Sequence, residues 1–187
     1  MYDLDLQQKY EQELGNFIIQ TEDVRIYLNP PFVVPLVNLV NFSTFLPSLV
    51  GWEVFNFLFL AAGTGIAFHF LKDSKSGKLL LLFSLGILSF FPGYKSLVIG
   101  QNSAMLFLGA ILLLVGTIRE KDWMAGIGLA IMTVRPHIVL PILITFIFKR
   151  RKVFWWFCGG AGVLGLFSLA YVGWEGIMGY LQMLAIS

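Results

Sequence analysis

Long apolar runs separated by short charged segments constrain the fold of this chain more than any other feature. Residues 54–71, 103–118 and 153–172 approach or reach the roughly 17–25 residues that a helix needs to cross a bilayer. The chain is 57% hydrophobic and 13% charged, whereas about a quarter of the residues in soluble domains are charged. The sequence therefore predicts an all-α, polytopic integral membrane protein with about five to seven membrane helices.

Two consecutive prolines separate a polar beginning from the apolar remainder. The first 28 residues carry six acids against two bases, and the string "NPPF" follows at 29–32. Adjacent prolines remove two backbone donors, so they fit a helix's first turn and not its interior. We predict a polar outer segment over residues 1–28 and a transmembrane helical domain over residues 29–187.

Lysine and arginine gather in short loops, and these loops orient the helices. "KRRK" at 149–152 has four bases and no acid, "KDSKSGK" at 72–78 has three bases and one acid, and "REKD" at 119–122 is balanced. Because bases mark the cytoplasmic side, we expect these three loops there. Residues 54–71 and 103–118 then run inward, and residues 79–92 and 153–172 run outward.

The stretch between the loops at 119–122 and 149–152 is too short to cross twice. It allows about 12 apolar residues each way, roughly 18 Å of helix per leg. We predict a short helical hairpin, broken by Pro136 and Pro141, whose tip at residues 135–137 turns below the outer surface. Unwound backbone at that depth needs protein or water around it. A charged residue within the membrane, here Arg135, is usually functional.

Residues 32–47 are short and polar for a crossing. Asn38, Asn41 and Thr44 recur every three residues and share one helix face. If this segment crossed, the lysine loop at 72–78 would lie outside, against the distribution of bases in membrane proteins. We expect a helix that lies in the outer interface or dips in and back. A full crossing stays open as the alternative.

Residues at the expected outer face could bind an anion. Gly100-Gln101-Asn102-Ser103 opens a predicted helix, where Asn or Ser could simply cap free N–H groups. A helix N-terminus also suits a phosphate, and Arg135 would bring a guanidinium suited to forked phosphate contacts. By contrast, two separated histidines without a carboxylate cluster argue against a metal site, and no cofactor motif occurs in the right context.

An ordered set of motifs resembles a known enzyme family. The set comprises "YD" at 2–3, "NPPF" at 29–32, "FFPGYKSLVIGQNS" at 90–103, "WMAGIGLAIMTVRPHIVLPILI" at 123–144, "KRRK" at 149–152 and "VGWEGIMGYL" at 172–181. Together these strings resemble glycosyltransferase family 87, a GT-C family of polyprenol-phosphate-mannose-dependent mannosyltransferase-like proteins. Arg135 stands where the family more usually has Lys, which keeps the charge but changes its geometry.

The resemblance implies an inverting hexosyltransferase with a GT-C-like bundle in a bacterial plasma membrane, with its active face periplasmic. It implies a polyprenyl-phosphate-sugar donor, carrying mannose or a similar hexose or pentose, and a glycolipid or glycan acceptor. Neither nucleic acid nor a cofactor is implied, and a divalent metal is left open. The residues implied to line the donor phosphate or sugar site are Gln101, Asn102, Arg135 and His137. Those implied to line the outer cavity are Asn29, Tyr94 and Lys95.

The resemblance also implies that parts of the enzyme lie outside this chain. The family's general base is an Asp just after the first transmembrane helix, which corresponds to a place upstream of Met1. Asp3 and Asp5 match the region that follows, so neither is assigned that role. We expect a fragment, or a subunit completed by another chain, that is inactive alone. The competing hypothesis is a non-catalytic membrane protein, a small transporter or scaffold for an anionic or lipid-linked solute.

Overall fold

The structure, a computed structural model, describes residues 30–41, 45–71 and 102–186. Some predicted features lie outside these ranges: the polar segment 1–28, the loop at 72–78, the helix over 79–92, and the residues Asn29, Tyr94, Lys95 and Gln101. Every regular element in the described ranges is a helix, which confirms the all-α prediction. The chain divides into two compact units, residues 1–36 with 165–187 and residues 37–164, and each is described by itself.

The prolines after the polar segment begin a helical stretch, as the sequence predicts. Pro30 is the N-cap and Pro31 the first residue of the 3-10 helix η1 (Pro31–Val33), which leads into α2 (Val34–Leu39). The expected single helix over residues 32–47 is wrong, because α2 ends at Leu39 and the next helix begins at Phe45. Together η1 and α2 extend roughly 15 Å, about half of the hydrocarbon core of a bilayer.

Helix α3 (Phe45–Leu71) begins nine residues before the predicted start at Val54. A single glutamate does not interrupt a helix, because Glu is a good helix former. Residues 46–70 are long and apolar enough to cross a membrane, and only 17% of the most apolar stretch is buried in the protein. Large apolar side chains such as Phe57 and Leu58 are exposed, as lipid-facing residues are.

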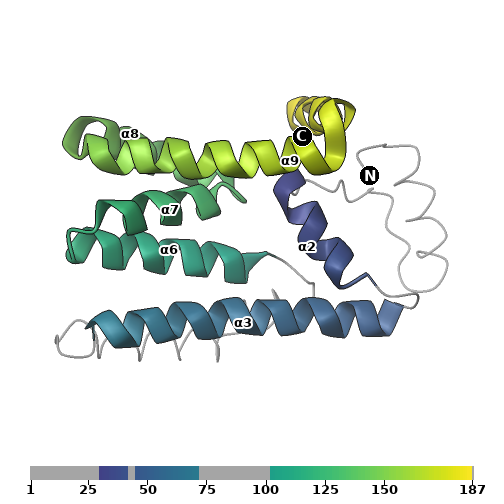
Figure 1. Ribbon diagram of the computed structural model, residues 1–187, viewed down its shortest axis with the longest axis horizontal. Helices are drawn as coiled ribbons and strands as arrows, with labels where there is room; N and C mark the ends of the chain where they lie inside the picture. The colour runs from purple at the N-terminus through teal and green to yellow at the C-terminus, as the bar shows by residue number, and fades with distance from the viewer. Residues whose placement is uncertain (1–29, 42–44, 72–101, 187) are drawn as a thin grey trace. The chain divides into compact units, whose positions relative to one another are not determined.

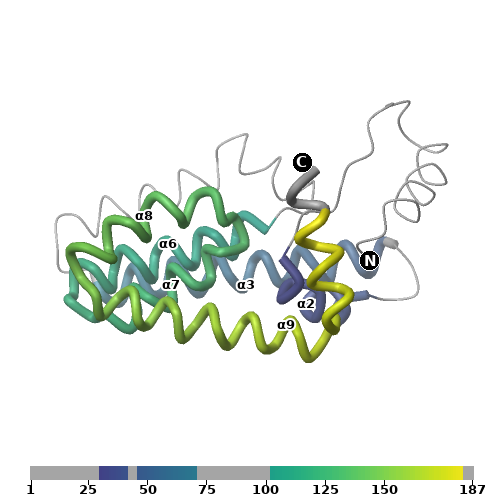
Figure 2. The backbone as a smooth tube through the Cα atoms, turned by 90° about the horizontal axis from the view of Figure 1, so that it is seen from above, coloured from purple at the N-terminus to yellow at the C-terminus, as the bar shows by residue number. Residues whose placement is uncertain are grey.

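The second unit, residues 37–164, is built of helices that pack side by side (Figures 1 and 2). Helix α6 (Ser103–Ile118) packs against both α3 and α7 (Asp122–Met132). The C-terminal ends of α3 and α6 meet, since Arg119 Nε donates a hydrogen bond to the Phe70 carbonyl at 2.9 Å. Thus α3 and α6 run in the same direction, as predicted, while the side of the membrane toward which they run stays a prediction.

Glycines bring α6 and α7 into backbone contact. A Cβ atom added at Gly128 would lie 2.6 Å from both the Gly109 carbonyl oxygen and the Leu113 nitrogen. At Gly116, an added Cβ would lie 2.4 Å from the Ala125 nitrogen. Small residues of this kind allow close approach of membrane helices, where van der Waals packing replaces the hydrophobic driving force.

Helices α7 and α8 (Pro136–Lys149) form the predicted hairpin. They have 11 and 14 residues, so their legs are about 16 and 21 Å long. The tip is the turn Thr133–Arg135, in which Arg135 N–H donates to the Met132 carbonyl at 2.9 Å. Pro136 is the first residue of α8, but Pro141 lies inside that helix and does not end it, which corrects the prediction for Pro141. The buried cluster that holds the legs together includes Leu129 and Val139.

Helix α9 (Arg151–Ile186) is broken at Gly173, close to the predicted end at Val172. Gly173 has φ 70°, in the left-handed region that glycine adopts without steric cost. Residues 151–182 include the second stretch long and apolar enough to cross a membrane, whereas α6, α7 and α8 are shorter apolar helices. The described part of the chain is therefore a membrane helical protein, and the full count of membrane helices stays a prediction.

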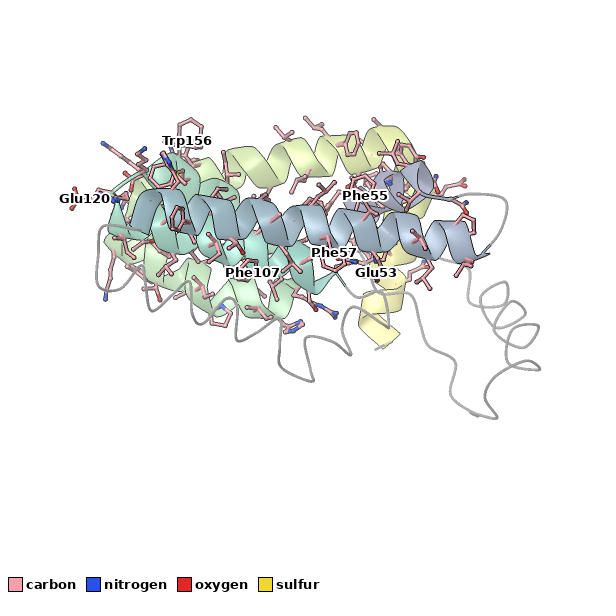
Figure 3. All side chains as sticks on the ribbon, turned by 90° about the horizontal axis from the view of Figure 1, so that it is seen from below. Glu53, Phe55, Phe57, Phe107, Glu120 and Trp156 are labelled. Carbon is pink, nitrogen blue, oxygen red and sulfur yellow. The ribbon has the colours of Figure 1, made fainter. Side chains whose placement is uncertain are left out.

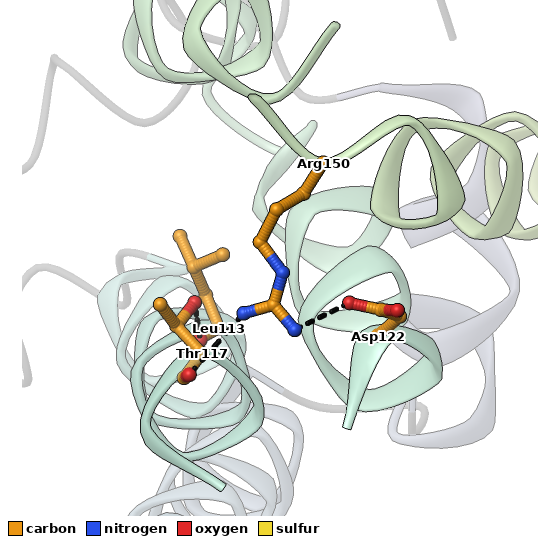
Figure 4. Close-up of polar contacts among 4 residues, drawn as sticks. All are labelled: Leu113, Thr117, Asp122 and Arg150. Atoms are coloured by element: carbon orange, nitrogen blue, oxygen red, sulfur yellow. Dashed lines mark hydrogen bonds and ion pairs between the residues drawn. The ribbon is translucent and has the colours of Figure 1, made fainter. Parts of the chain in front are cut away.

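Charged residues gather at one end of the second unit, where α3 and α6 end and α7 and α9 begin. Arg150 forms an ion pair with Asp122, Nη2 to Oδ1 at 2.6 Å, and donates from Nη1 to the Thr117 carbonyl at 3.2 Å (Figure 4). Lys121 Nζ lies 4.6 Å from the centre of the Phe70 ring. The loops at 119–122 and 149–152 thus meet at one end of the second unit, as predicted. We call this end the charged end.

Candidate functional site

The end of the second unit opposite the charged end holds the described candidate residues. Asn102 is the N-cap residue of α6 and is only 3% exposed. Arg135 closes the turn of the hairpin as the N-cap residue of α8, and His137 lies in the first turn of that helix. Arg135 is half-buried and His137 is exposed. These three residues therefore share one end of the unit, as the sequence analysis expects.

The contacts between helices give the depth of the hairpin tip. Because a Cβ added at Gly109 of α6 would lie 2.7 Å from Met132 Cγ, the end of α7 lies beside the middle of α6. Leu106 also packs against the hairpin's buried cluster. Arg135 is therefore near the level of Leu106, about one helical turn or roughly 6 Å short of Asn102 along the bundle. The tip lies inside the start of α6, and its depth below the membrane surface stays a prediction.

Arg135 is a cation without a carboxylate partner in the described part of the chain. The ion pair found there joins Arg150 to Asp122 at the charged end. The local hydrogen bonds of Arg135 come from its backbone, whose carbonyl accepts the Ile138 N–H at 3.0 Å. A half-buried guanidinium is suited to forked, charge-assisted hydrogen bonds with an anionic ligand.

The side chain of Asn102 does not cap α6. The structure therefore does not support the interpretation that Asn102 serves to cap the helix with its side chain. The first N–H groups of a helix have no partner within the helix and point out of its N-terminus. The positive end of the α6 dipole therefore favours an anionic group at this end of the unit, one turn away from the level of Arg135.

Two polar residues on α3 were missed by the sequence analysis. Asn56 is 1% exposed, and its Nδ2 atom, like Glu53 Oε1, is buried without a hydrogen-bond partner in the described structure. Gly63 faces Phe107 of α6, so Asn56 lies within about one turn of the start of α6. Figure 3 shows Glu53 toward one end of α3 and Glu120 toward the other.

A sequence signal for these two residues exists. Glu53 is the one acidic or basic residue, apart from His69, between Leu46 and Phe70. An ionisable residue inside a long apolar run is costly and often functional. The signal was lost because the predicted start of the helix at Val54 left Glu53 outside the membrane segment.

Comparison with known protein families matches residues 27–187 to Glycosyltransferase family 87. The chain belongs to glycosyltransferase family 87. Family membership confirms the resemblance and makes the protein a membrane glycosyltransferase. The matched range contains every candidate site residue but begins after Tyr2-Asp3. Searches of curated proteins and of solved structures each found no match to this chain.

Family 87 membership does not by itself assign a role to any single residue. Asn102, Arg135 and His137 keep their predicted roles at the donor phosphate or sugar as predictions, and so does Gln101. Within the described ranges, no three His, Cys, Asp or Glu side chains are close enough to hold a metal ion. At this end of the unit the described residues offer hydrogen-bonding groups, the positive charge of Arg135 and the carboxyl group of Glu53.

Proposed function

We propose that this family 87 protein transfers a sugar, mannose or a similar hexose or pentose, from a polyprenyl-phosphate-sugar to a glycolipid or glycan acceptor. The observation that carries the proposal is the half-buried Arg135 at the hairpin tip, without a carboxylate partner among the described residues and distant from the charged end. A donor of this class combines an apolar chain, a phosphate and a sugar. An isolated cation at depth in a membrane protein suits its phosphate.

The proposed reaction breaks the bond between the anomeric carbon and the donor phosphate oxygen. The acceptor hydroxyl attacks the anomeric carbon from the opposite face, which inverts its configuration, and gives its proton to a carboxylate base. The bond electrons leave with the phosphate oxygen. Arg135 and the positive end of the α6 dipole stabilise the charge that develops there, and such stabilisation is usually the largest single contribution to catalysis.

The remaining candidate residues would orient the donor. Asn102, Gln101 and His137 can donate or accept hydrogen bonds, which suits sugar hydroxyls and phosphate oxygens. Fixing the anomeric carbon in line with the acceptor lowers the entropic part of the barrier. We also propose that this end of the unit is at the periplasmic face of a bacterial plasma membrane, in keeping with the bases at the opposite end.

A transfer assay in vesicles tests the proposed function. The active enzyme, in which the carboxylate base is supplied by the same chain or by a second one, is reconstituted with polyprenyl-phosphate-linked sugars or with nucleotide-linked sugars, each carrying a radiolabel, and with a glycolipid acceptor. We expect the label to move to the acceptor only from the polyprenyl-phosphate donors. Heat-denatured protein is the control. Transfer only from nucleotide sugars, or solute flux into the vesicles without any transfer, contradicts the proposal.

Cysteine labelling tests the proposed orientation. In a Cys158→Ser background, one variant carries Glu120→Cys at the charged end, and a second carries His137→Cys at the hairpin tip. Both positions are exposed on the protein. We expect a membrane-impermeant maleimide to label the His137→Cys variant in intact cells and the Glu120→Cys variant only after permeabilisation. The reverse pattern contradicts the orientation but leaves the transfer assay unaffected.

A further inference from the structure

An open apolar groove of about 500 Å³ lies between α7 and α9 in the second unit. Ile127, Ala130 and Ile131 form its α7 side, and its α9 side extends from Trp156 to Leu164. Its size is within the range of small-ligand sites, roughly 300–1,000 Å³. None of the candidate donor-site residues lines it, so the proposed sugar transfer leaves this groove unexplained.

Glycines create the groove. The helices α7 and α9 touch closely at Gly126, where an added Cβ would lie 2.3 Å from Trp156 Cβ. Further along, a Cβ added at Gly160 would contact only Ala130, and one added at Gly159 would have no atom within 4 Å. Val163 on the same side is 66% exposed. The groove is thus open to the surroundings of the protein, which for a membrane helix means lipid.

A run of bases precedes the groove on α9. Arg151 and Lys152 are exposed and lie five and four residues before Trp156, respectively, about 6–8 Å along the helix. Figure 3 shows Trp156 toward the same end as Glu120. Residues 119–122 and 149–152 together carry six bases and two acids, a net charge of +4. One of those acids, Asp122, is already paired with Arg150.

We propose that the groove holds an acyl chain of an anionic phospholipid from the surrounding bilayer, with the lipid phosphate against Arg151 and Lys152. The apolar walls suit a hydrocarbon chain, and the adjacent bases favour a negative headgroup over a zwitterionic one. Trp156 lies between the two parts, where an amphipathic ring fits the boundary between headgroup and chain. This inference does not rest on the proposed sugar transfer.

Two other occupants fit the groove less well. A polyprenyl-phosphate donor would place its phosphate at the charged end, whereas Arg135 lies at the opposite end of the unit. The occupant must also neutralise the exposed bases Arg151 and Lys152 before the groove, which the phosphate of a phospholipid does and an apolar helix of a second copy does not.

Native mass spectrometry of the full-length protein with added phosphatidylglycerol or phosphatidylcholine tests the inference. We expect the wild-type protein to bind one phosphatidylglycerol in preference to phosphatidylcholine. The double variant Arg151→Gln/Lys152→Gln is expected to bind phosphatidylglycerol about thirtyfold more weakly, the change that two bases at a membrane surface produce. Its affinity for phosphatidylcholine should stay the same.

A pair of glycine variants separates filling of the groove from a general effect on α9. Gly159→Leu places a side chain in the groove and should abolish binding of both lipids. Gly162→Leu is the matched control, because Gly162 also has no atom within 4 Å of an added Cβ but does not line the groove. Helix content by circular dichroism checks that both variants fold. If Gly159→Leu does not fold, phosphatidylglycerol binding by the Arg151→Gln/Lys152→Gln variant still tests the inference.

Four results would overturn the inference. They are equal affinity of the wild-type protein for the two lipids, undiminished phosphatidylglycerol binding by the double variant, equal loss of binding in the two glycine variants, and displacement of phosphatidylglycerol by polyprenyl phosphate. A wild-type dimer that Gly159→Leu dissociates would assign the groove to a second copy instead. None of these outcomes bears on the transfer assay.

Discussion

Arg135→Ala is expected to lower kcat/KM for sugar transfer about a hundredfold, the effect of removing one group that stabilises developing negative charge. The physical reason is that the leaving phosphate loses a half-buried guanidinium that has no carboxylate partner in the described structure. The measurement is the vesicle transfer assay with a polyprenyl-phosphate donor at several concentrations, so that kcat and KM are separated.

Two control variants separate the effect of removing the charge at position 135 from the effect of removing a base elsewhere in the protein. Arg135→Lys keeps the positive charge and is expected to retain activity within about tenfold of wild type, since only the forked geometry is lost. Lys149→Ala removes an exposed base at the charged end and should leave transfer unchanged. A rate for Arg135→Ala within about twofold of wild type, with normal folding, would remove Arg135 from the proposed site.

Gly128→Leu is expected to be among the most destabilising single changes in the described structure. Even the Cβ atom of the new side chain would lie 2.6 Å from two backbone atoms of α6. Backbone cannot move aside as a flexible side chain can, so the helices must separate. Overpacking typically costs about 1–3 kcal/mol, and we expect a loss in the free energy of unfolding at or above the top of that range.

Unfolding in mixed micelles of increasing denaturing detergent, followed by circular dichroism, measures this loss. Gly128→Ala gives an intermediate case, because it adds only the Cβ atom. Gly162→Ala is the matched control on α9, where an added Cβ meets open space. It should leave stability unchanged or raise it by up to about 1 kcal/mol through helix propensity. Equal destabilisation at positions 128 and 162 would contradict backbone contact between α6 and α7.

The parts of the fold that the sequence predicted correctly depend on local rules. The hairpin followed from the number of residues between two charged loops, and the start of η1 followed from two adjacent prolines. The break of α9 lies one residue beyond the end of the predicted span 153–172, and Gly173 supplies the positive φ there. Each of these features is decided within a few residues of chain, so the sequence contains it directly.

The features that the sequence analysis missed depend on which helices meet. The start of α3 at Phe45 includes a glutamate that a rule based on charge alone would exclude. The hydrogen bond from Arg119 to the Phe70 carbonyl joins residues 49 apart in the sequence. The groove beside Gly159 exists only because α7 and α9 touch at Gly126 and leave space beyond it. Hydrophobic patterns do not specify such pairings.

For the candidate site, the described structure gives the positions of three residues, and their roles stay predictions. Asn102, Arg135 and His137 share the end opposite the charged loops, as the alternation of helix directions requires. Asn56 was not predicted, although its buried amide is within about one turn of the start of α6. Whether the three predicted residues bind one donor depends on side-chain geometry around a ligand, which motif spacing does not contain.

The short legs of the hairpin also constrain how the protein is made. Neither α7, with 11 residues, nor α8, with 14, is long enough to partition into a bilayer as an independent insertion unit. The two helices must therefore enter together during biogenesis, after the ribosome has released both. The glycine-lined face of α6 is the surface that can receive them. Integration of this segment is consequently an intramolecular assembly step and not a one-helix-at-a-time process.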